Sequence, residues 1–337
     1  MRSICIIIFL STLPGLTHAQ DEWIQIGSFV EWPESLKEST SPQTQSDLAF
    51  QTIAHSEVVS EYAPAPLLPA GDGNTIVRPQ YRQKYSTNAW QMLPDGLLYH
   101  SYVAGEKEPR FASQWLWEKD RGRVWEANVG GRWGLVRKGG YGPDADGFQF
   151  DVEGAALVRI DPENEQDLEA VDFRAGFYGS WKQGQWRYKL GYSHISSHVG
   201  DEFLLDNMGF NRRNYVRDSF LLGVTYDVYD DLQVYGEFSG AWNANGGAEF
   251  GELQFGAQWM PVEPVFLHGA PFAAVNAHLR QEYNFGGAIN TMAGWQWRSP
   301  RSHNTFRFGL MHYNGPSMQW SFTDHESLTG LGIWYDY

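Results

Sequence analysis

From Phe111 to the end of the chain, large apolar side chains recur at every second position over long segments. In residues 124–136, Trp125, Val129 and Trp133 alternate with polar residues such as Glu126 and Arg132. Side chains two positions apart point to the same side of a β-strand. The alternation therefore predicts strands with one apolar and one polar face.

The number and length of these segments narrow the fold class. Most are about 10 to 14 residues long, whereas the commonest soluble strand has about 5–6 residues and a membrane-spanning strand needs about 9–11. We expect about twelve strands, an even number as in single-chain outer-membrane barrels. The expected strands are Phe111–Glu118, 124–136, 147–160, 170–182, Trp186–Val199, Asn214–Val228, Leu232–Asn243, Ala248–Trp259, Ala273–Tyr283, Gly287–Arg298, Thr305–Asn314 and Leu328–Tyr337.

Two environments can produce two-faced strands: the core of a soluble β-sandwich, or the wall of a membrane barrel whose apolar face meets lipid. The polar faces carry charges such as Asp151, Glu153, Asp172 and Arg174, which a polar lumen accommodates. Closure also pairs every backbone group, as a membrane requires. We therefore predict an all-β fold, an antiparallel transmembrane β-barrel in the outer membrane. A secreted carbohydrate-binding β-sandwich is the alternative.

The residues before the barrel divide into three parts. Residues 1–19 have Arg2, a short apolar run and Ala19, the pattern of a signal peptide. Residues 20–85, rich in Pro, Ser and acidic groups, predict a loosely ordered, irregular periplasmic lead-in. Residues 86–110 predict an entry or plug segment, and 111–337 the barrel. Cys5, within the predicted signal, is the only cysteine, which excludes disulfides and thiol ligands from the mature chain.

The formal net charge of -15 argues against nucleic acid as a partner, because phosphates demand a basic face. The chain ends LGIWYDY, in which Leu331, Ile333, Tyr335 and Tyr337 alternate. Outer-membrane barrels commonly end in this way, and the barrel assembly machinery reads that ending. The expected partners are therefore this machinery and membrane lipid or lipopolysaccharide.

Polar residues gather at the end of one predicted strand, in the stretch YSHISSHVGDEF (residues 192–203). His194, Ser196 and His198 continue the face that carries Trp186 and Tyr188, so they are expected on the outer wall. Polar groups facing lipid are costly and indicate function. A hydroxyl beside an imidazole is the minimal activated nucleophile, and a carboxylate or amide that orients the imidazole completes the set.

The partner strand supplies two candidates for that orienting group. If the strands at 186–199 and 214–228 form a hairpin, one register compatible with the alternation places Asp218 opposite His194 and Asn214 opposite His198. A shift of two residues would exchange the partners. The predicted catalytic set is therefore Ser196 and His194 with Asp218, Asn214 and His198.

Two sets of motifs in this sequence resemble those of known families. His194-Ile195-Ser196 resembles the His-x-Ser pair of outer-membrane phospholipase A and of the lipid A deacylases, although those enzymes usually have Asn where Ser197 stands. That resemblance implies a lipid esterase with its nucleophile and base on the outer wall. LPDGLLYHSYVAGEKEPR, SSHVGDEF and YGEFSG together resemble a bacterial domain-of-unknown-function family, the one numbered 1207. This second resemblance spans about residues 85–337 and implies membership without an activity.

Other interpretations of the same residues stay open. The histidines can be a polar cap where the strand leaves the bilayer, hydrogen-bonded at the interface. His198, Asp201 and Glu202 can hold a metal, and the carboxylates of Asp201, Glu202 and Asp206 suit calcium better than zinc. A non-enzymatic pore or structural barrel is the rival function, with charges such as Arg132 and Asp151 lining the lumen.

Overall fold

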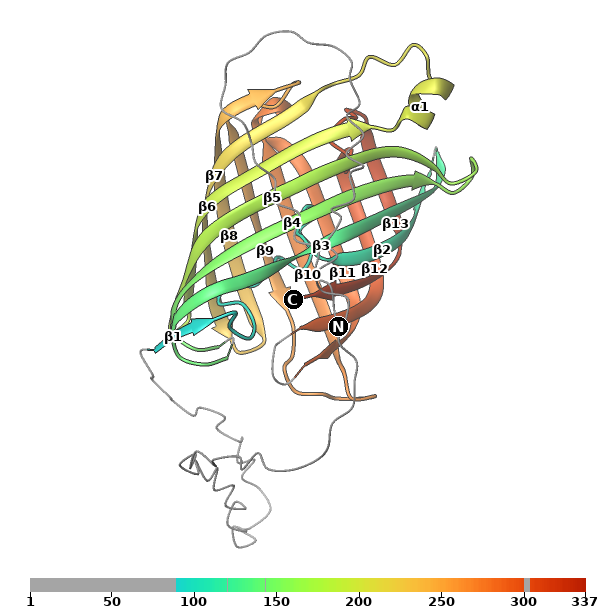
Figure 1. Cartoon of the computed structure of the whole chain (residues 1–337). Coiled ribbons are helices and arrows are strands. Elements are labelled where there is room, and N and C mark those ends of the chain that lie inside the picture. Colours follow the sequence, from blue (N-terminus) through green and yellow to red (C-terminus); the bar gives the residue numbers. More distant parts are fainter. Residues whose placement is uncertain (1–88, 120, 143, 300–303) are drawn as a thin grey trace, which may run out of the picture. The chain divides into compact units, whose positions relative to one another are not determined.

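The computed structural model describes residues 89–119, 121–142, 144–299 and 304–337. The predicted signal peptide and periplasmic lead-in lie outside the described residues. Within them the chain forms an antiparallel β-barrel with little helix (Figure 1). No helix in this part of the chain is long and apolar enough to cross a membrane.

Twelve strands, β2 to β13, form the wall, and the sheet closes because β2 pairs with β13 as well as with β3. A short strand, β1, pairs with the end of β3. The predicted barrel is confirmed, and the alternative prediction of a β-sandwich, with two stacked sheets, is wrong. The strands are β1 (Ala89–Met92), β2 (Phe111–Glu118), β3 (Gly122–Gly139), β4 (Gly147–Asp161), β5 (Asp167–Gln183), β6 (Trp186–Val199), β7 (Tyr215–Tyr229), β8 (Leu232–Asn245), β9 (Gly251–Trp259), β10 (Ala270–Arg280), β11 (Gly286–Arg298), β12 (Thr305–Pro316) and β13 (His325–Asp336).

Each of these twelve strands overlaps a predicted one, and the differences lie at strand ends. The strand expected from Ala248 begins at Gly251, because Gly246 and Gly247 have φ values of 66° and 92° and form a turn there. The strand expected at 273–283 runs from Ala270 to Arg280 and is followed by a single 3₁₀ turn, η2 (Gln281–Tyr283).

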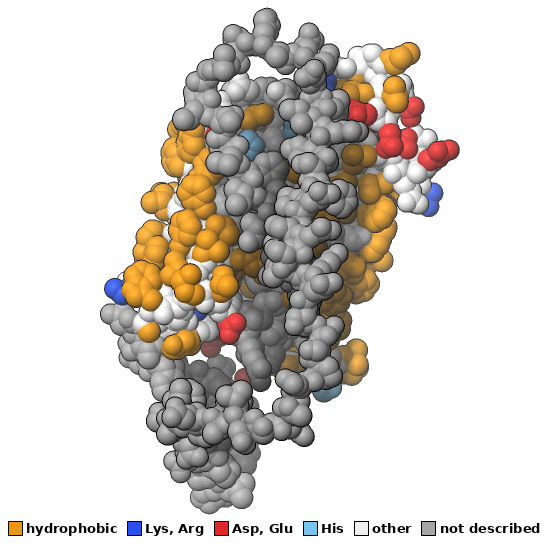
Figure 2. All heavy atoms as spheres, viewed as in Figure 1, with side chains coloured by type: hydrophobic (Ala, Val, Ile, Leu, Met, Phe, Trp, Pro, Cys, Tyr) orange, Lys and Arg blue, Asp and Glu red, His pale blue; other side chains and the backbone are white. Residues whose placement is uncertain are grey.

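The apolar face of the wall points outward. Trp186, Tyr188 and Leu190 on β6 are 42–50% exposed, and Leu222 on the neighbouring strand β7 is 55% exposed. Figure 2 shows hydrophobic side chains covering the visible sides of the barrel. Residues of the opposite parity on β6, such as Arg187 and Lys189, are buried inside.

The inner face is charged, as the alternation predicted, and many of its charges are paired. Glu153 accepts from Arg132 at 2.9 Å and from Arg174 at 2.7 Å. Arg159 contacts Glu126 and Glu326 at 2.5 Å each. All of these side chains are buried or nearly so.

Residues 97–110, called here the luminal segment, lie inside the barrel. Val103 N donates to Gln258 Oε1 at 2.9 Å, and Asn290 Nδ2 donates to Ala104 O at 2.8 Å. Val103 and Ala104 also belong to an apolar cluster with Phe272 on the inner wall. The segment is therefore attached to the wall by both polar and apolar contacts.

A second stretch, residues 317–322 between β12 and β13, is also buried inside and is called here the inner loop. Trp320 N donates to Asp172 Oδ2 at 3.1 Å, and Ser321 Oγ lies 2.7 Å from Ser197 Oγ. The inner loop meets the luminal segment at Lys107, whose Nζ donates to Met318 O and lies 5.3 Å from the Trp320 ring centre. Two stretches of chain thus fill much of the lumen.

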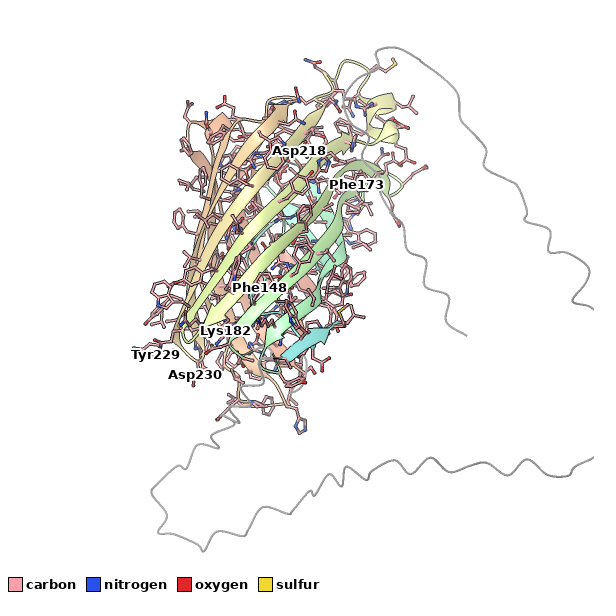
Figure 3. All side chains as sticks on the ribbon, turned by 60° about the vertical axis from the view of Figure 1, so that its left-hand side comes forward. Phe148, Phe173, Lys182, Asp218, Tyr229 and Asp230 are labelled. Carbon is pink, nitrogen blue, oxygen red and sulfur yellow. The ribbon has the colours of Figure 1, made fainter. Side chains whose placement is uncertain are left out.

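The two ends of the barrel differ. The connections Gly184–Gln185 and Asp230–Asp231 are tight turns at one end, and Figure 3 shows Lys182, Tyr229 and Asp230 there. The connection between β6 and β7 lies at the other end and carries the short helix α1 (Asp201–Asp206). Asp218 and Phe173 lie toward this second end (Figure 3).

Candidate outer-wall site

Strand β6 carries the predicted site residues on its outward face. The alternation along β6 is unbroken, so His194, Ser196 and His198 follow Trp186 and Tyr188 on the same face, while Ser193, Ile195 and Ser197 are buried inside. The side chains of His194, Ser196 and His198 are each half-buried at the outer surface.

The neighbouring strand brings a carboxylate to His194. β6 and β7 pair in the register that places Asp218 directly opposite His194. His194 Nδ1 lies 2.8 Å from Asp218 Oδ1, and the two side chains are 34% and 18% exposed. Because an ionised carboxylate can only accept, the hydrogen between them sits on Nδ1, so in the neutral imidazole Nε2 carries the lone pair.

Three further side chains complete a network around Asp218. Tyr192 Oη donates to Asp218 Oδ1 at 2.6 Å, and Asn243 Nδ2 donates to Asp218 Oδ2 at 2.7 Å. Asn245 Nδ2 in turn donates to Asn243 Oδ1 at 2.8 Å. Tyr192 shares the outward parity of His194 on β6, so the alternation could have indicated it. No signal in the sequence pointed to the two asparagines.

Ser196 lies on the same face, two residues beyond His194. It pairs with Val216 of β7 on one side and Phe173 of β5 on the other. Within the described residues, no hydrogen bond joins Ser196 to His194. Side chains two apart on a strand start about 6.6 Å from each other at the backbone, so contact between them depends on rotamers.

Asn214 and His198 are not joined as the register predicted. The β6–β7 ladder ends at the pair Ser197–Tyr215, so Asn214 lies one residue beyond it. His198 instead packs against Phe173, with ring centres 5.9 Å apart. Of the two orienting candidates, only Asp218 contacts His194 among the residues the structure describes.

The predicted metal ligands are not brought together. In the described part of the chain, no group of three or more His, Asp, Glu or Cys side chains could hold a metal ion, calcium included. His198 points to the outer wall, whereas Glu202 of α1 turns back to accept the Leu168 backbone N–H at 2.7 Å. Asp201 is exposed, and Asp206 accepts from Asn164 at 2.8 Å.

A second imidazole–hydroxyl pair lies elsewhere on the outer wall. His312 Nδ1 on β12 is 2.7 Å from Thr329 Oγ1 on β13, and both residues are exposed. Among the described residues, no carboxylate forms an ion pair with His312. It provides an internal comparison for the site on β6 and β7.

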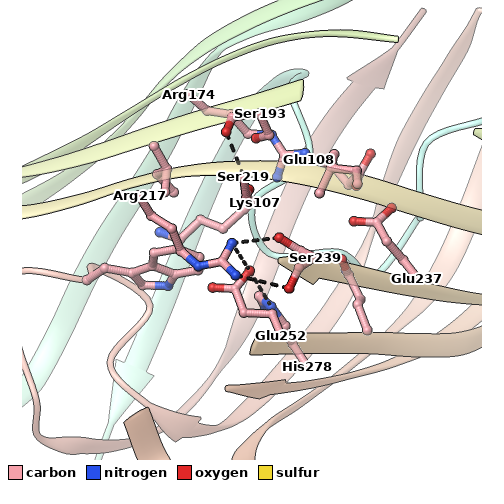
Figure 4. Close-up of a pocket in the computed structure, with 14 residues that line it drawn as sticks. Lys107, Glu108, Arg174, Ser193, Arg217, Ser219, Glu237, Ser239, Glu252 and His278 are labelled. Atoms are coloured by element: carbon pink, nitrogen blue, oxygen red, sulfur yellow. Dashed lines mark hydrogen bonds and ion pairs between the residues drawn. The ribbon is translucent and has the colours of Figure 1, made fainter. Parts of the chain in front are cut away.

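The lumen contains a denser polar cluster around a small cavity (Figure 4). Arg217 pairs with Glu252 at 3.0 Å and donates to Ser239 Oγ at 2.6 Å, and His278 lies 3.0 Å from Glu106. The cavity volume is ≈ 20 Å³, which holds about one water molecule. Here the charges pair with one another, and the cluster ties the luminal segment to the wall.

One family model matches most of the chain. The family model described as "Protein of unknown function (DUF1207)" matches residues 51–337. The chain belongs to the DUF1207 family. The match confirms the predicted membership. It begins at residue 51, whereas the motifs predicted a start at about residue 85. None of the curated protein sequences matches this DUF1207 protein.

Several solved structures of outer-membrane proteins are distantly similar to this DUF1207 protein. Outer membrane phospholipase A from Escherichia coli is 8% identical, with a TM-score of 0.44 over 68% of this chain and 92% of its own. The calcium-bound Salmonella typhi outer membrane phospholipase dimer is 10% identical, with a TM-score of 0.44 over 68% and 91%. A mutant Rh. blastica porin is 10% identical, with a TM-score of 0.29 over 68% and 99%.

Proposed function

We propose that this protein is an outer-membrane hydrolase that cleaves acyl esters of membrane lipids on the outer wall of its barrel. The observation that carries the proposal is the 2.8 Å contact between His194 Nδ1 and Asp218 Oδ1 on the outward face, with the Ser196 hydroxyl two residues along. An imidazole held in this way presents Nε2 as a general base.

The surroundings support a lipid substrate. Phe220, Leu222 and Trp242 are exposed on the outer faces of β7 and β8, next to the network around Asp218. A lipid that diffuses in the membrane plane would reach Ser196 without entering the barrel. With the long α1 connection outside the cell, as short periplasmic turns imply, the site would face the outer leaflet and its phospholipid or lipopolysaccharide.

The chemistry is a two-step acyl transfer. The Ser196 Oγ attacks the ester carbonyl while its proton passes to His194 Nε2, and Asp218 stabilises the imidazolium that forms. The bond to the alcohol then breaks, and the alcohol leaves with that proton. Water gives a proton to His194 and attacks the acyl-serine. The bond between the acyl group and Ser196 Oγ breaks, the fatty acid is released, and His194 returns the proton to Ser196 Oγ. The Ser196–His194 hydrogen bond would form as substrate binds, because such contacts often tighten only in the substrate complex.

The rival functions, a pore and a polar cap of the strand, make different demands on the lumen and on the outer-wall site. A pore needs an open lumen, whereas the luminal segment and the inner loop fill much of it. A polar cap of the strand needs no Ser196–His194 chemistry.

The test is an assay of the purified protein in detergent on phospholipid and on lipopolysaccharide. Fatty acid release that disappears in Ser196→Ala and in His194→Ala supports the hydrolase. Equal release by the wild type and both variants, or no release from either lipid, contradicts it. Thr329→Ala and His312→Ala are the matched controls, because they remove the other outer-wall pair.

A further inference from the structure

Strand β8 departs from regular pairing beside the candidate site. Asp218 pairs with Asn243, but the next residue, Ser219, pairs with Ala241, so Trp242 is an extra residue on β8. Such a β-bulge re-aims the side chains that follow it. Here Trp242 and Asn243 are both exposed on the outer face, although they are adjacent in sequence.

The contact between Asn243 of the bulge and Asp218 is direct. Asn243 Nδ2 donates to Asp218 Oδ2 at 2.7 Å. The amide is itself oriented, because Asn245 Nδ2 donates to Asn243 Oδ1 at 2.8 Å and leaves the Asn243 amino group facing the carboxylate. In an unbulged strand, Asn243 would share the inward parity of Glu237 and Ser239 and could not reach Asp218.

Trp242, the extra residue of the bulge, acts on Asp218 through the ring of Tyr192. Trp242 stacks on Tyr192 with ring centres 5.4 Å apart and an interplanar angle of 29°. The Tyr192 hydroxyl donates to Asp218 Oδ1 at 2.6 Å. Both residues of the bulge therefore act on Asp218: Asn243 directly at Oδ2, and Trp242 through Tyr192 at Oδ1.

This convergence bears on His194. Asp218 Oδ1 is shared between Tyr192 and His194 Nδ1, so the carboxylate can rotate only if the bonds to Tyr192 and Asn243 break. A fixed carboxylate keeps the hydrogen of the imidazole on Nδ1 and the lone pair on Nε2. We propose that the β8 bulge is the positioning device of the outer-wall site, with Asn243 and Trp242 as its positioning residues. The inference rests on the proposed function only for the role of the positioned imidazole as a general base.

The test has two readouts, one of which needs no catalysis. Nitrogen-15 NMR of the histidine rings in detergent micelles reports which ring nitrogen of His194 carries the hydrogen, with His194→Ala assigning the signal. We expect the wild type to show the Nδ1–H form, and Asn243→Ala to show a mixture of both forms. Ester release should fall about 10- to 100-fold in Asn243→Ala, as misplacement of a catalytic group does.

Further variants separate a positioning role of the bulge from an effect on folding. Trp242→Ala keeps the register and removes the ring that stacks on Tyr192, so it should give the same NMR mixture. Deletion of Trp242 should restore regular pairing with Asn243 still outward and opposite Asp218, so it removes the same ring and should also give the mixture. Asn314→Ala, an exposed asparagine on the outer face of β12, is the control that should leave both readouts at wild-type values.

The outcomes are distinct. An unchanged Nδ1–H form in Asn243→Ala overturns the positioning role, whatever the enzyme does. A mixture in Asn243→Ala, with a wild type that releases no fatty acid, supports the positioning role and rejects the hydrolase. A mixture together with reduced release supports both.

Discussion

Lys107 of the luminal segment and Asp172 of β5 form an ion pair of 2.5 Å in which both side chains are buried. The same ammonium donates to the Met318 carbonyl of the inner loop, and Asp172 also accepts from Ser197 and from Trp320 N. One ion pair thus joins the luminal segment, the barrel wall and the inner loop.

Breaking this pair should destabilise the barrel strongly. Lys107→Met leaves Asp172 charged and buried, and removal of one partner of a buried pair costs about 3–5 kcal/mol. The double variant Lys107→Met/Asp172→Asn should cost less than the single one, because no uncompensated charge remains. Urea unfolding in detergent, followed by tryptophan fluorescence, measures both. Equal stability of Lys107→Met and the wild type would contradict the ion pair.

The contents of the lumen also make a prediction about conductance. In planar bilayers the wild type should show no stable ion channel, because residues 97–110 and 317–322 are buried inside the wall. The triple variant Lys107→Ala/Glu108→Ala/Arg110→Ala removes the ion pairs to Asp172, Arg132 and Asp336 and should show intermittent openings. Lys138→Ala, at an exposed position of β3, is the control that stays closed. Wild-type porin-like conductance would restore the pore hypothesis.

Acid should weaken the attachment of the luminal segment. Burial alone would raise the pKa of Glu106, but the hydrogen bond and charge of His278, with Arg280 and Lys107, lower this pKa overall below its usual 4.5. A lowered carboxyl pKa contributes stability that is present above the unfolded value and is lost as pH falls through the folded value. Unfolding free energy should therefore drop with acidification below about pH 4.5.

Glu106→Gln should remove part of that acid dependence. The amide cannot titrate, so the unfolding free energy of this variant should change less between pH 6 and pH 3 than that of the wild type. Glu263→Gln, at an exposed position between β9 and β10, serves as the matched control. A Glu106→Gln variant as acid-sensitive as the wild type would show that Glu106 does not titrate with folding.

The sequence predicts the wall well and its irregularities poorly. Strict alternation fixes which side of each strand meets the outside, and the parity of a two-strand hairpin is enough to put Asp218 opposite His194. The alternation on β8 places Asn243 inside with Ser239, and one extra residue at Trp242 reverses that. A bulge carries no signal in a single sequence, because it changes the pairing without changing the pattern.

Loops were predicted less well, for a similar reason. Residues 317–322 have no periodicity, so nothing in their sequence indicates that Trp320 and Phe322 turn into the lumen. The acidic residues of α1 looked like metal ligands, yet Glu202 satisfies a backbone N–H of β5 instead. Such roles depend on which backbone groups a closed barrel leaves unpaired at its rim.

The outward stripe makes a prediction that tests membrane insertion directly. Leu222 lies midway along β7, faces outward and pairs with Leu190. Leu222→Lys should destabilise the protein in lipid by about 2–4 kcal/mol, as a cation at mid-membrane depth does in such barrels. Leu205→Lys, on the exposed helix α1, should have little effect. Equal unfolding free energies of the two variants in lipid bilayers would place β7 outside the membrane.

Asp218 provides the sharpest test of whether the outer-wall network is catalytic. Three donors, from Tyr192, His194 and Asn243, converge on its two oxygens, and an amide has only one oxygen to accept them. Asp218→Asn should therefore lower ester release by about 10²- to 10⁴-fold, since an amide that faces His194 with its amino group selects the wrong tautomer. Asp218→Ala should be at least as impaired.

The same variants distinguish catalysis from a polar cap. Both leave donors unpaired on the wall, which costs about 1–3 kcal/mol of stability in either case. Only a catalytic network loses turnover while the residual folded protein still binds lipid, so kcat per folded molecule is the quantity to measure. His312→Ala removes an exposed outer-wall imidazole whose ring contacts a threonine hydroxyl instead of a carboxylate, and it should keep wild-type kcat. Wild-type kcat in Asp218→Asn would mean that His194 is held for stability alone, and that Ser196 is a surface hydroxyl.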